Sequence, residues 1–400
     1  MEPFQSTIEL PVKGQCTYLF EVIDVNNLVK IEFHNKNNIK QSIKFAIDIS
    51  GISLIIDFDG ILPIQKTNSL KGLINVKGAF YWISLDAQNQ LIKFGIGEAR
   101  PETKVFEYKI VSETDKIYEM NKKFLESMTT LSNNNNDVKK NIKNLKLLKD
   151  PIINTVPLIV KNTDELTMND IAEYKYLPHS FLTPINQKLY ECISGKKFVL
   201  DDKDFPHFSK AIEYSIATEG CWCNTKLKEK STEFNPDKPN ISETYLRITL
   251  GRNSGESPGI PYVMEIWPSN HYSPIHSHAN SNAIIRVLHG SINVSLFPFL
   301  SEGQIIDSFG EANFEKDDVT WLSPELNQIH QLKNINQKET CITIQCYMYG
   351  LSNNKHYDYF DYIDDDKNIV QYEPDSDMDF VEFKALMKKE WNERKKCFFC

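Results

Sequence analysis

Apolar and polar residues alternate along the first part of this chain in a way that predicts β-strands. Apolar side chains stand at every second position in residues 29–34 and 43–50. A period of two places these side chains on one face of a strand. A further pair of apolar segments, 80–85 and 91–96, is separated by a polar turn and predicts a hairpin. We therefore expect a separate all-β, sandwich-like domain over residues 1–112.

The pattern changes to a helical period after this domain. Apolar residues recur at three- or four-residue intervals in two stripes, which are Ile117, Met120, Phe124, Met128 and Leu131, then Val138, Ile142, Leu145 and Leu148. Each stripe predicts one face of a helix. The polar run Asn133–Asn136 between them predicts a flexible break. Residues 113–175 are therefore predicted to be a helical, Asn-rich linker.

Strand patterns return in the second half of the chain, after a predicted helix over residues 205–218. Seven short apolar segments follow, at 245–250, 262–267, 283–288, 291–297, 319–322, 329–333 and 340–349. Such closely spaced strands predict a jelly-roll barrel preceded by helices, over residues 176–356. The predicted fold class is therefore mainly β. Residues 357–400 form an acidic and then basic tail, with a helix predicted at 380–396.

Composition narrows the classes of function. The formal net charge of −9, without a long cluster of lysine or arginine, argues against a nucleic-acid partner. No apolar run approaches the ~20 residues that cross a bilayer, and the N-terminus does not resemble a signal peptide. Eight scattered cysteines do not form a disulfide framework, so we expect a reduced, cytoplasmic protein.

The chain ends in Cys397-Phe398-Phe399-Cys400, after a short basic stretch. This has the frame of a prenylation box, with Cys397 as the acceptor. Neither the phenylalanine fillers nor the terminal cysteine is usual for that signal, so we expect an ordinary exposed tail.

Three histidines carry the most specific chemical signal in the chain. His276 and His278 are two residues apart, and in a strand such residues point to the same face. His330 lies in a later predicted strand, after a turn that contains Pro324. Imidazole suits iron, zinc, copper or nickel. The three histidines therefore predict a metal site.

The spacing of these histidines resembles the two motifs of the cupin superfamily. His276, His278 and Gly290 match the first motif, and Pro324, His330 and Asn334 match the second. Asn282 and Ala283 stand where most metal-binding cupins carry a glutamate ligand. The resemblance therefore implies three neutral histidine ligands and no carboxylate.

The sequence has no carboxylate at the ligand position and contains the phrases SPIHSHANS and VLHGS. In these features it most closely resembles the cysteine dioxygenase family of thiol dioxygenases. The resemblance runs from about Tyr245 to Tyr347. It implies Fe²⁺ as the cofactor and oxidation of L-cysteine by O₂ to cysteine sulfinic acid. A small thiol and O₂ are then the expected partners.

The same resemblance assigns roles to three further residues. In the phrase Tyr245-Leu246-Arg247, the arginine would bind the substrate carboxylate, with Tyr245 beside it. The hydroxyl of Tyr347 would point into the pocket. Two alternatives stay open at this point: Arg247 as part of a structural ion pair, and Tyr349 in the place of Tyr347.

Two positions depart from the family. Ala283 replaces a cysteine that in many members is crosslinked to the tyrosine, so Tyr347 should be uncrosslinked. Gln345 stands where the family has a histidine in Ser-x-His-x-Tyr, and glutamine carries neither proton nor charge. Three functions therefore stay open: a cysteine dioxygenase, a dioxygenase for another small carboxylate-bearing thiol, and a cupin that binds a metal or ligand without turnover.

Residues 80–108 resemble the farnesoic-acid-methyltransferase-like β domain. They contain no evident catalytic constellation. We therefore expect the N-terminal domain to bind a protein or ligand partner, or to act as a scaffold.

Overall fold

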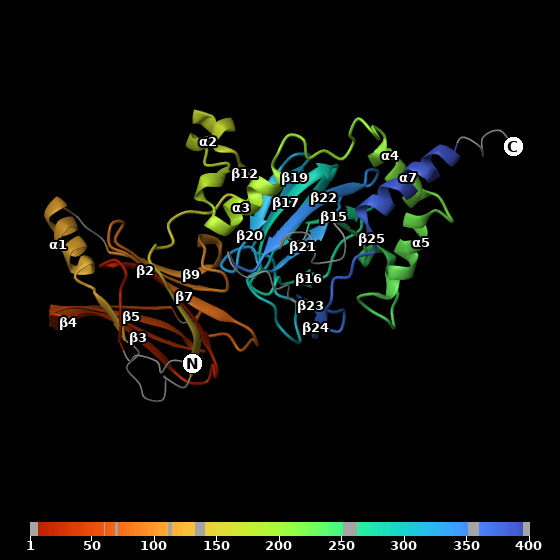
Figure 1. Ribbon diagram of the computed structural model, residues 1–400. Helices are drawn as coiled ribbons and strands as arrows, with labels where there is room; N and C mark the ends of the chain where they lie inside the picture. The colour runs from red at the N-terminus through yellow and green to blue at the C-terminus, as the bar shows by residue number, and fades with distance from the viewer. Residues whose placement is uncertain are drawn as a thin grey trace. The chain divides into compact units, whose positions relative to one another are not determined.

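The computed structural model describes residues 7–59, 61–68, 71–110, 114–132, 141–250, 262–350 and 360–394. The chain divides into two compact units, Met1–Thr155 and Val156–Cys400. Each unit is built around two β-sheets (Figure 1), which confirms the mainly β class. No helix in these described ranges is both long and apolar enough to cross a membrane.

The first unit contains two antiparallel sheets. In spatial order, the six-stranded sheet is β1 (Thr7–Glu9), β10 (Thr130–Ser132), β3 (Val29–Asn35), β4 (Asn38–Asp48), β5 (Gly51–Phe58) and β6 (Ile61–Asn68). The five-stranded sheet is β11 (Ile142–Leu148), β2 (Gln15–Val22), β7 (Phe80–Asp86), β8 (Leu91–Ile96) and β9 (Lys104–Lys109). In the part of this unit that the structure describes, the helical segments are η1 (Pro101–Thr103) and α1 (Asp115–Glu126).

The alternating patterns in this unit form the strands that they predict. Ile31 and Phe33 of β3 are buried, as are Ile43 and Phe45 of β4, while the intervening Lys44 is exposed. Burying each such apolar side chain contributes about 1.5–3 kcal/mol. The hairpin of β7 and β8 also forms as predicted.

The helical linker predicted over residues 113–175 is wrong for much of its length. The first stripe forms α1, whose N-terminus is capped by the side chain of Thr114, but the helix ends at Glu126. Residues 142–148 form the strand β11, which pairs with β2, and not a second helix. The three-residue spacing of the apolar side chains departs from the two-residue period of a regular strand, and β11 accommodates it through a register shift between Lys143 and Lys146. Pairing with residues more than 100 positions away therefore overrides the local helical pattern. The run Asn133–Asn136 lies outside the described residues.

The second unit contains two larger sheets, and they are separate and not one closed barrel. The eight-stranded sheet is β13 (Leu177–Pro178), β12 (Val160–Lys161), β20 (Val319–Leu322), β17 (Asn282–His289), β22 (Cys341–Met348), β15 (Tyr262–Trp267), β14 (Leu246–Leu250) and β25 (Met378–Asp379). The six-stranded sheet is β19 (Gly310–Glu315), β18 (Ser291–Leu296), β21 (His330–Lys333), β16 (Ile275–His276), β23 (Phe360–Ile363) and β24 (Ile369–Tyr372).

Helices cover one face of the eight-stranded sheet (Figure 1). α3 contacts β17 and β22, while α5 and α7 contact β14, and α4 packs against both α5 and α7. The helical segments among the described residues of this unit are η3 (Thr163–Glu165), α2 (Met168–Ala172), η4 (His179–Phe181), α3 (Pro184–Ile193), α4 (Phe208–Ala217), α5 (Trp222–Glu229), η5 (Lys230–Thr232), η6 (Ile241–Glu243) and α7 (Phe380–Glu393).

Residues 360–394, the described part of the tail predicted for residues 357–400, are an integral part of the second unit. Strands β23 and β24 extend the six-stranded sheet, β25 pairs with β14, and α7 buries Phe383 and Met387 against the other helices. The acidic composition of this segment hid its short strands, because exposed aspartates lie between the few buried apolar residues. Cys397 and its neighbours lie outside the described residues.

Side chains alternate between the two faces of strands β14, β15 and β22 of the eight-stranded sheet. In β22, Ile342, Ile344 and Cys346 pack against the helices, so residues 343, 345 and 347 point to the opposite, inner face. On that inner face, Trp267 and Val287 pack against apolar side chains of the six-stranded sheet. The polar residues at inner positions of β14, β15 and β22 therefore lie between the two sheets, where the candidate site forms.

Candidate metal centre and substrate pocket

The three predicted metal ligands meet between the two sheets of the second unit. His276 ends β16 and His330 begins β21, and the two residues are direct partners in the antiparallel pairing. His278 lies just beyond β16, before a turn in which Ala279 and Asn280 adopt positive φ angles of 45° and 65°. One ligand nitrogen from each histidine lies within 4.8 Å of the others. His276 and His278 converge although they do not share a strand, because β16 ends at His276.

Hydrogen bonds orient two of the imidazole rings for ligation. Nδ1 of His276 lies 3.0 Å from the carbonyl oxygen of Pro274, and Nδ1 of His330 lies 3.0 Å from that of Asn327. A carbonyl oxygen only accepts, so each Nδ1 carries the proton and each Nε2 has a free lone pair. This is the usual arrangement around metal-bound histidines.

The third histidine completes a donor set that fits a metal ion. Nε2 of His278 lies 3.2 Å from Nε2 of His330. Its Nδ1 is buried and has no hydrogen-bond partner among the described residues. Three neutral imidazoles that converge in this way suit a divalent transition metal and leave further coordination positions open. The donor set alone does not distinguish iron from zinc, copper or nickel.

Burial keeps these histidines neutral. It lowers the pKa of His276 to about 3 and the pKa of His330 to about 4. Burial, together with the neighbouring His330 and His276, lowers the pKa of His278 well below its usual value. Protons therefore do not compete for the three nitrogens near neutral pH, and the neutral form is the one that binds a metal.

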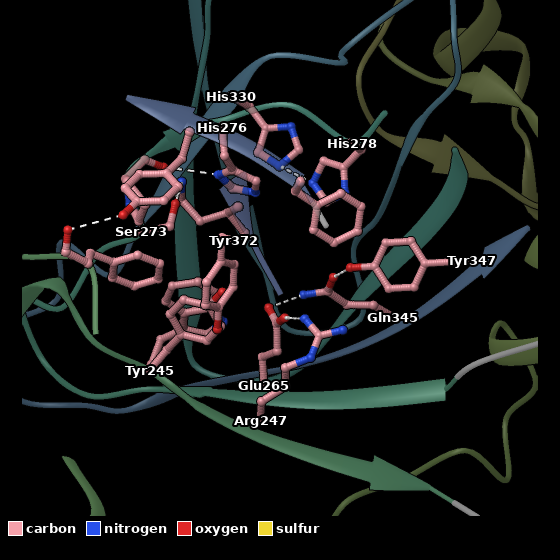
Figure 2. Close-up of a pocket in the computed structure, with 16 residues that line it drawn as sticks. Tyr245, Arg247, Glu265, Ser273, His276, His278, His330, Gln345, Tyr347 and Tyr372 are labelled. Carbon is pink, nitrogen blue, oxygen red and sulfur yellow. Dashed lines mark hydrogen bonds and ion pairs between the residues drawn. The ribbon is translucent and has the colours of Figure 1, made fainter. Parts of the chain in front are cut away.

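A row of polar side chains on the inner face of the eight-stranded sheet lies across the pocket from the histidines (Figure 2). Arg247 and Glu265 are direct partners in the pairing of β14 with β15. Nη1 of Arg247 lies 3.1 Å from Oε1 of Glu265, and both side chains are almost fully buried. The amide of Gln345 donates to Oε2 of Glu265, and the hydroxyl of Tyr347 donates to Oε1 of Gln345.

The hydrogen bonds in this row can run in only one direction when Glu265 is ionised. Burial raises the pKa of Glu265, but the adjacent Arg247 and the Gln345 amide stabilise the carboxylate. An ionised carboxylate only accepts, so Gln345 must turn its NH₂ group to Glu265 and its oxygen to Tyr347. Tyr347 must then use its proton on Gln345.

Aromatic side chains form most of the remaining wall. The pocket and the solvent space at its opening together contain about 460 Å³ of empty space. The ring of Tyr245 stacks on that of Trp267, with centroids 4.3 Å apart. Six aromatic residues besides Tyr347 line the pocket, namely Phe234, Tyr245, Trp267, Phe360, Tyr362 and Tyr372. These rings limit the access of water to the histidines.

All six residues predicted for the site line this one pocket: Tyr245, Arg247, His276, His278, His330 and Tyr347. Tyr349 follows the end of β22 and is not among the lining residues. Ala283 pairs directly with Tyr347 across β17 and β22, so this neighbour offers no thiol for a crosslink. The ion-pair alternative for Arg247 is also realised, because Glu265 is its partner.

The other residues of the two cupin-like motifs support the site without lining it. Gly290 has a φ of 68° in the tight connection between β17 and β18. The amide of Asn334 donates to the carbonyl oxygens of Trp267, at 2.9 Å, and Glu339, at 2.8 Å. It therefore joins the ends of β15 and β21 beneath the pocket.

Glu265 is a charged pocket residue that the motif comparison missed. Its signal was present in the segment Tyr262–Trp267, where Val263, Glu265 and Trp267 occupy one face of the strand. A lone carboxylate on an otherwise apolar face needs a buried partner. Arg247, the basic residue of the preceding predicted strand, was the available one.

No known protein-family profile matches the chain. Several solved structures are similar to parts of it. An oxalate oxidase in complex with the substrate analogue glycolate is 14% identical, with a TM-score of 0.21 over 28% of this chain and 53% of its own. The Schizosaccharomyces pombe Cnp3 cupin domain is 16% identical, with a TM-score of 0.20 over 26% of this chain and 63% of its own.

A cupin 2 domain-containing protein from Halorhodospira halophila is 14% identical, with a TM-score of 0.22 over 38% of this chain and 83% of its own. The matched region spans about half of the oxalate oxidase chain and less than two thirds of the Cnp3 chain. These similar structures are cupin proteins that include both an enzyme and other cupin domains.

Proposed function

We propose that the second unit is an iron(II)-dependent thiol dioxygenase that oxidises L-cysteine with O₂ to cysteine sulfinic acid. This proposal is carried by one observation, namely that three histidines and an arginine face each other across one buried pocket. Three neutral histidines converge on one side, and Arg247 faces them from the other (Figure 2). The candidate ligand set contains no carboxylate, unlike that of most metal-binding cupins, and this difference supports a thiol dioxygenase.

His276 and His330 would hold the metal through their Nε2 atoms, as the hydrogen bonds of their Nδ1 atoms indicate. His278 would complete the set through Nε2, which lies 3.2 Å from Nε2 of His330. When bound, a ferrous ion would supply electrons to O₂ and a positive charge that favours the thiolate form of the substrate. The overall reaction is RSH + O₂ → RSO₂H. Both atoms of O₂ end on sulfur, so the reaction needs no further reductant.

The protein's own side chains would bind and orient the substrate. Arg247 has five N–H donors in a planar fork, which suits the carboxylate of an amino acid. A substrate held at its carboxylate presents its thiol in a fixed direction, and this positioning lowers the entropic cost of reaction. The aromatic walls, including the stacked Tyr245 and Trp267, restrict water during the reaction.

Tyr347 stands at the end of the polar row, close to the histidines. Its ring lies over that of His278, with centroids 5.8 Å apart. Burial raises the pKa of Tyr347 well above its usual value, so the hydroxyl stays protonated and bonded to Gln345. We infer that it positions the substrate through its oxygen lone pairs and does not act as a proton donor.

Oxygen consumption by the anaerobically purified, Fe(II)-loaded protein tests this function. Addition of L-cysteine should start oxygen uptake, with one cysteine sulfinate formed for each O₂ consumed. His276→Ala should abolish uptake and lower the bound iron, while His289→Ala, a histidine outside the pocket, should leave both unchanged. No uptake by protein that retains its iron would contradict the cysteine dioxygenase.

Gln345 favours a second candidate, a cupin that binds a metal and a small ligand without turnover. Glutamine cannot transfer a proton, unlike the histidine that it replaces in the resembling family. Cysteine that binds the iron-loaded protein without oxygen uptake would support this second candidate. Uptake with another carboxylate-bearing thiol, but not with cysteine, would instead change only the substrate.

A further inference from the structure

We propose that Glu265 is a specificity-determining residue, which together with Arg247 selects thiols that carry both a carboxylate and an ammonium group. This inference rests on the proposed thiol-binding function and names the class of thiol. The relevant groups are the ion pair of Arg247 with Glu265 and the hydroxyl of Tyr347, all in the pocket wall opposite the histidines (Figure 2).

The charges of the pocket wall point to this class of substrate. Among the described residues that line the pocket, Arg247 and Glu265 are the only lysine, arginine, aspartate or glutamate. Lys230, which lies nearby over the ring of Tyr245, is paired with Asp377 and Glu233 outside the pocket. The wall therefore carries one positive and one negative charge, side by side.

An unpaired arginine would select any small anion, whereas this pair does not. A thiol with only a carboxylate meets the negative charge of Glu265 next to the guanidinium group. A thiol with only an ammonium group meets the positive charge of Arg247. A zwitterion can place its carboxylate at the guanidinium and its ammonium at the carboxylate, so that each charge faces its opposite.

Hydrogen-bonding capacity is available for both ends of the zwitterion. The bond from Nη1 to Glu265 is the one side-chain hydrogen bond that Arg247 makes within the described part of the chain, and guanidinium has further N–H donors. Each oxygen of Glu265 accepts one bond, from Arg247 or from Gln345, and has a second lone-pair site.

Tyr347 adds another acceptor for the ammonium group. Because its proton is used on Gln345, its oxygen can only accept a hydrogen bond from a substrate. Gln345 thus has a defined structural role in this pocket. A glutamine at this position fixes both Glu265 and Tyr347 as acceptors, and an ammonium group is the donor that complements two acceptors.

Binding of three thiols by the full-length, Fe(II)-loaded protein under anaerobic conditions tests the inference. The three are L-cysteine, 3-mercaptopropionate, which lacks the ammonium group, and cysteamine, which lacks the carboxylate. Calorimetry should show that cysteine binds the wild-type protein about tenfold or more tightly than either of the others, as expected for a charge contact worth about 1.4 kcal/mol.

Glu265→Gln should reverse part of this preference. Freed from its partner, Arg247 should bind 3-mercaptopropionate about tenfold more tightly, while the affinity for cysteamine should fall about tenfold. Glu311→Gln, an exposed glutamate on β19, is the matched control and should change none of the three affinities.

If Glu265→Gln fails to fold, the double variant Arg247→Met with Glu265→Leu removes both charges and leaves neither unpaired. It should bind all three thiols with affinities within a few-fold of one another. Unchanged affinity ratios in Glu265→Gln or in the double variant would overturn the inference, as would equal wild-type affinities for cysteine and 3-mercaptopropionate.

This calorimetry, together with the oxygen-consumption assay on the same three thiols, separates this inference from the proposed function. Charge-dependent binding of thiols without oxygen uptake would support the role of Glu265 and contradict the dioxygenase. Oxygen uptake with no discrimination by charge would do the reverse. Failure of all three thiols to bind would overturn both.

Discussion

At the scale of single residues, the directions of two linked hydrogen bonds fix the donors and acceptors on the polar side of the pocket. Glu265 accepts from Gln345, and Gln345 accepts from Tyr347. A histidine in the place of Gln345 could change its protonation state, whereas an amide cannot. The row is therefore a fixed arrangement of acceptors and not a path for protons.

Replacing Tyr347 by phenylalanine tests this arrangement. The variant loses a hydroxyl that touches the substrate in our account and leaves the amide oxygen of Gln345 without its donor, which costs about 1–3 kcal/mol. We expect kcat/KM for cysteine to fall about 10- to 100-fold. The bound iron, measured by elemental analysis, should be unchanged, because Tyr347 is not a ligand. Loss of the iron would contradict the assigned role.

Glu243 predicts a pH-dependent contribution to stability. Burial, assisted by Asp365, raises the pKa of this carboxyl to about 7. A carboxyl whose folded pKa lies above its unfolded value binds more protons when folded, so stability falls as the pH rises between about 4.5 and 7. At pH values above this range, the contribution of Glu243 to the free energy of unfolding stays constant at its lowered value.

Glu243→Gln should therefore stabilise the protein at pH 8, by about 1 kcal/mol after allowance for partial exposure. The gain should shrink as the pH is lowered from 7 towards 5. Denaturant unfolding at pH 5, 6, 7 and 8 measures it. A gain that grows on acidification would contradict the raised pKa.

At the scale of elements, the connection from β17 to β18 depends on one glycine. Gly290 has a φ of 68°, and a Cβ atom at this position would lie 2.6 Å from the carbonyl oxygen of Thr340. Both the backbone conformation and the close contact disfavour any side chain. The first strand of this hairpin, β17, is the strand that follows His276 and His278 in the chain.

Gly290→Ala should destabilise the second unit by about 1–3 kcal/mol. Gly310→Ala in β19 is the matched control, because a Cβ atom there would meet nothing within 4 Å. It should be neutral or slightly stabilising, since alanine reduces the entropy of the unfolded chain. Equal effects of the two variants on thermal unfolding would contradict the structural role of Gly290.

Elements with strong local patterns were predictable from the sequence, and elements that depend on distant partners were not. The strands at 262–267, 319–322 and 330–333 fall where the apolar patterns placed them. β16 has only two residues and exists because it pairs with β21 and β23. A two-residue strand has no period of its own, so no local pattern could reveal it.

The candidate site divides in the same way. The three histidines, predicted from their spacing, and the three further residues that the family resemblance supplied all line one pocket. Glu265 belongs to no motif, and its meaning comes from its position opposite Arg247 in the pairing of β14 with β15. Knowledge of that strand pairing was needed to recognise the ion pair.

At the scale of the whole molecule, the candidate metal ligands all lie in the second unit. A metal that binds the folded state alone adds about 2.7 kcal/mol of stability when its free concentration is 100 times Kd. Removal of iron by a chelator should therefore lower the melting temperature of the second unit. The transition of the first unit should not move.

Scanning calorimetry of the full chain, with iron and after chelation, can resolve these transitions. His276→Ala provides the control, because its second-unit transition should no longer respond to iron. A chelator-induced shift of the first unit alone would contradict the location of the metal site.

The central claim is that both atoms of O₂ are added to the sulfur of a bound thiol. Mass spectrometry of the product formed from L-cysteine under ¹⁸O₂ tests it most directly. The account predicts cysteine sulfinate that contains two ¹⁸O atoms, formed by the wild-type protein and not by His276→Ala. Cystine as the sole product, or sulfinate with oxygen derived from water, would contradict it.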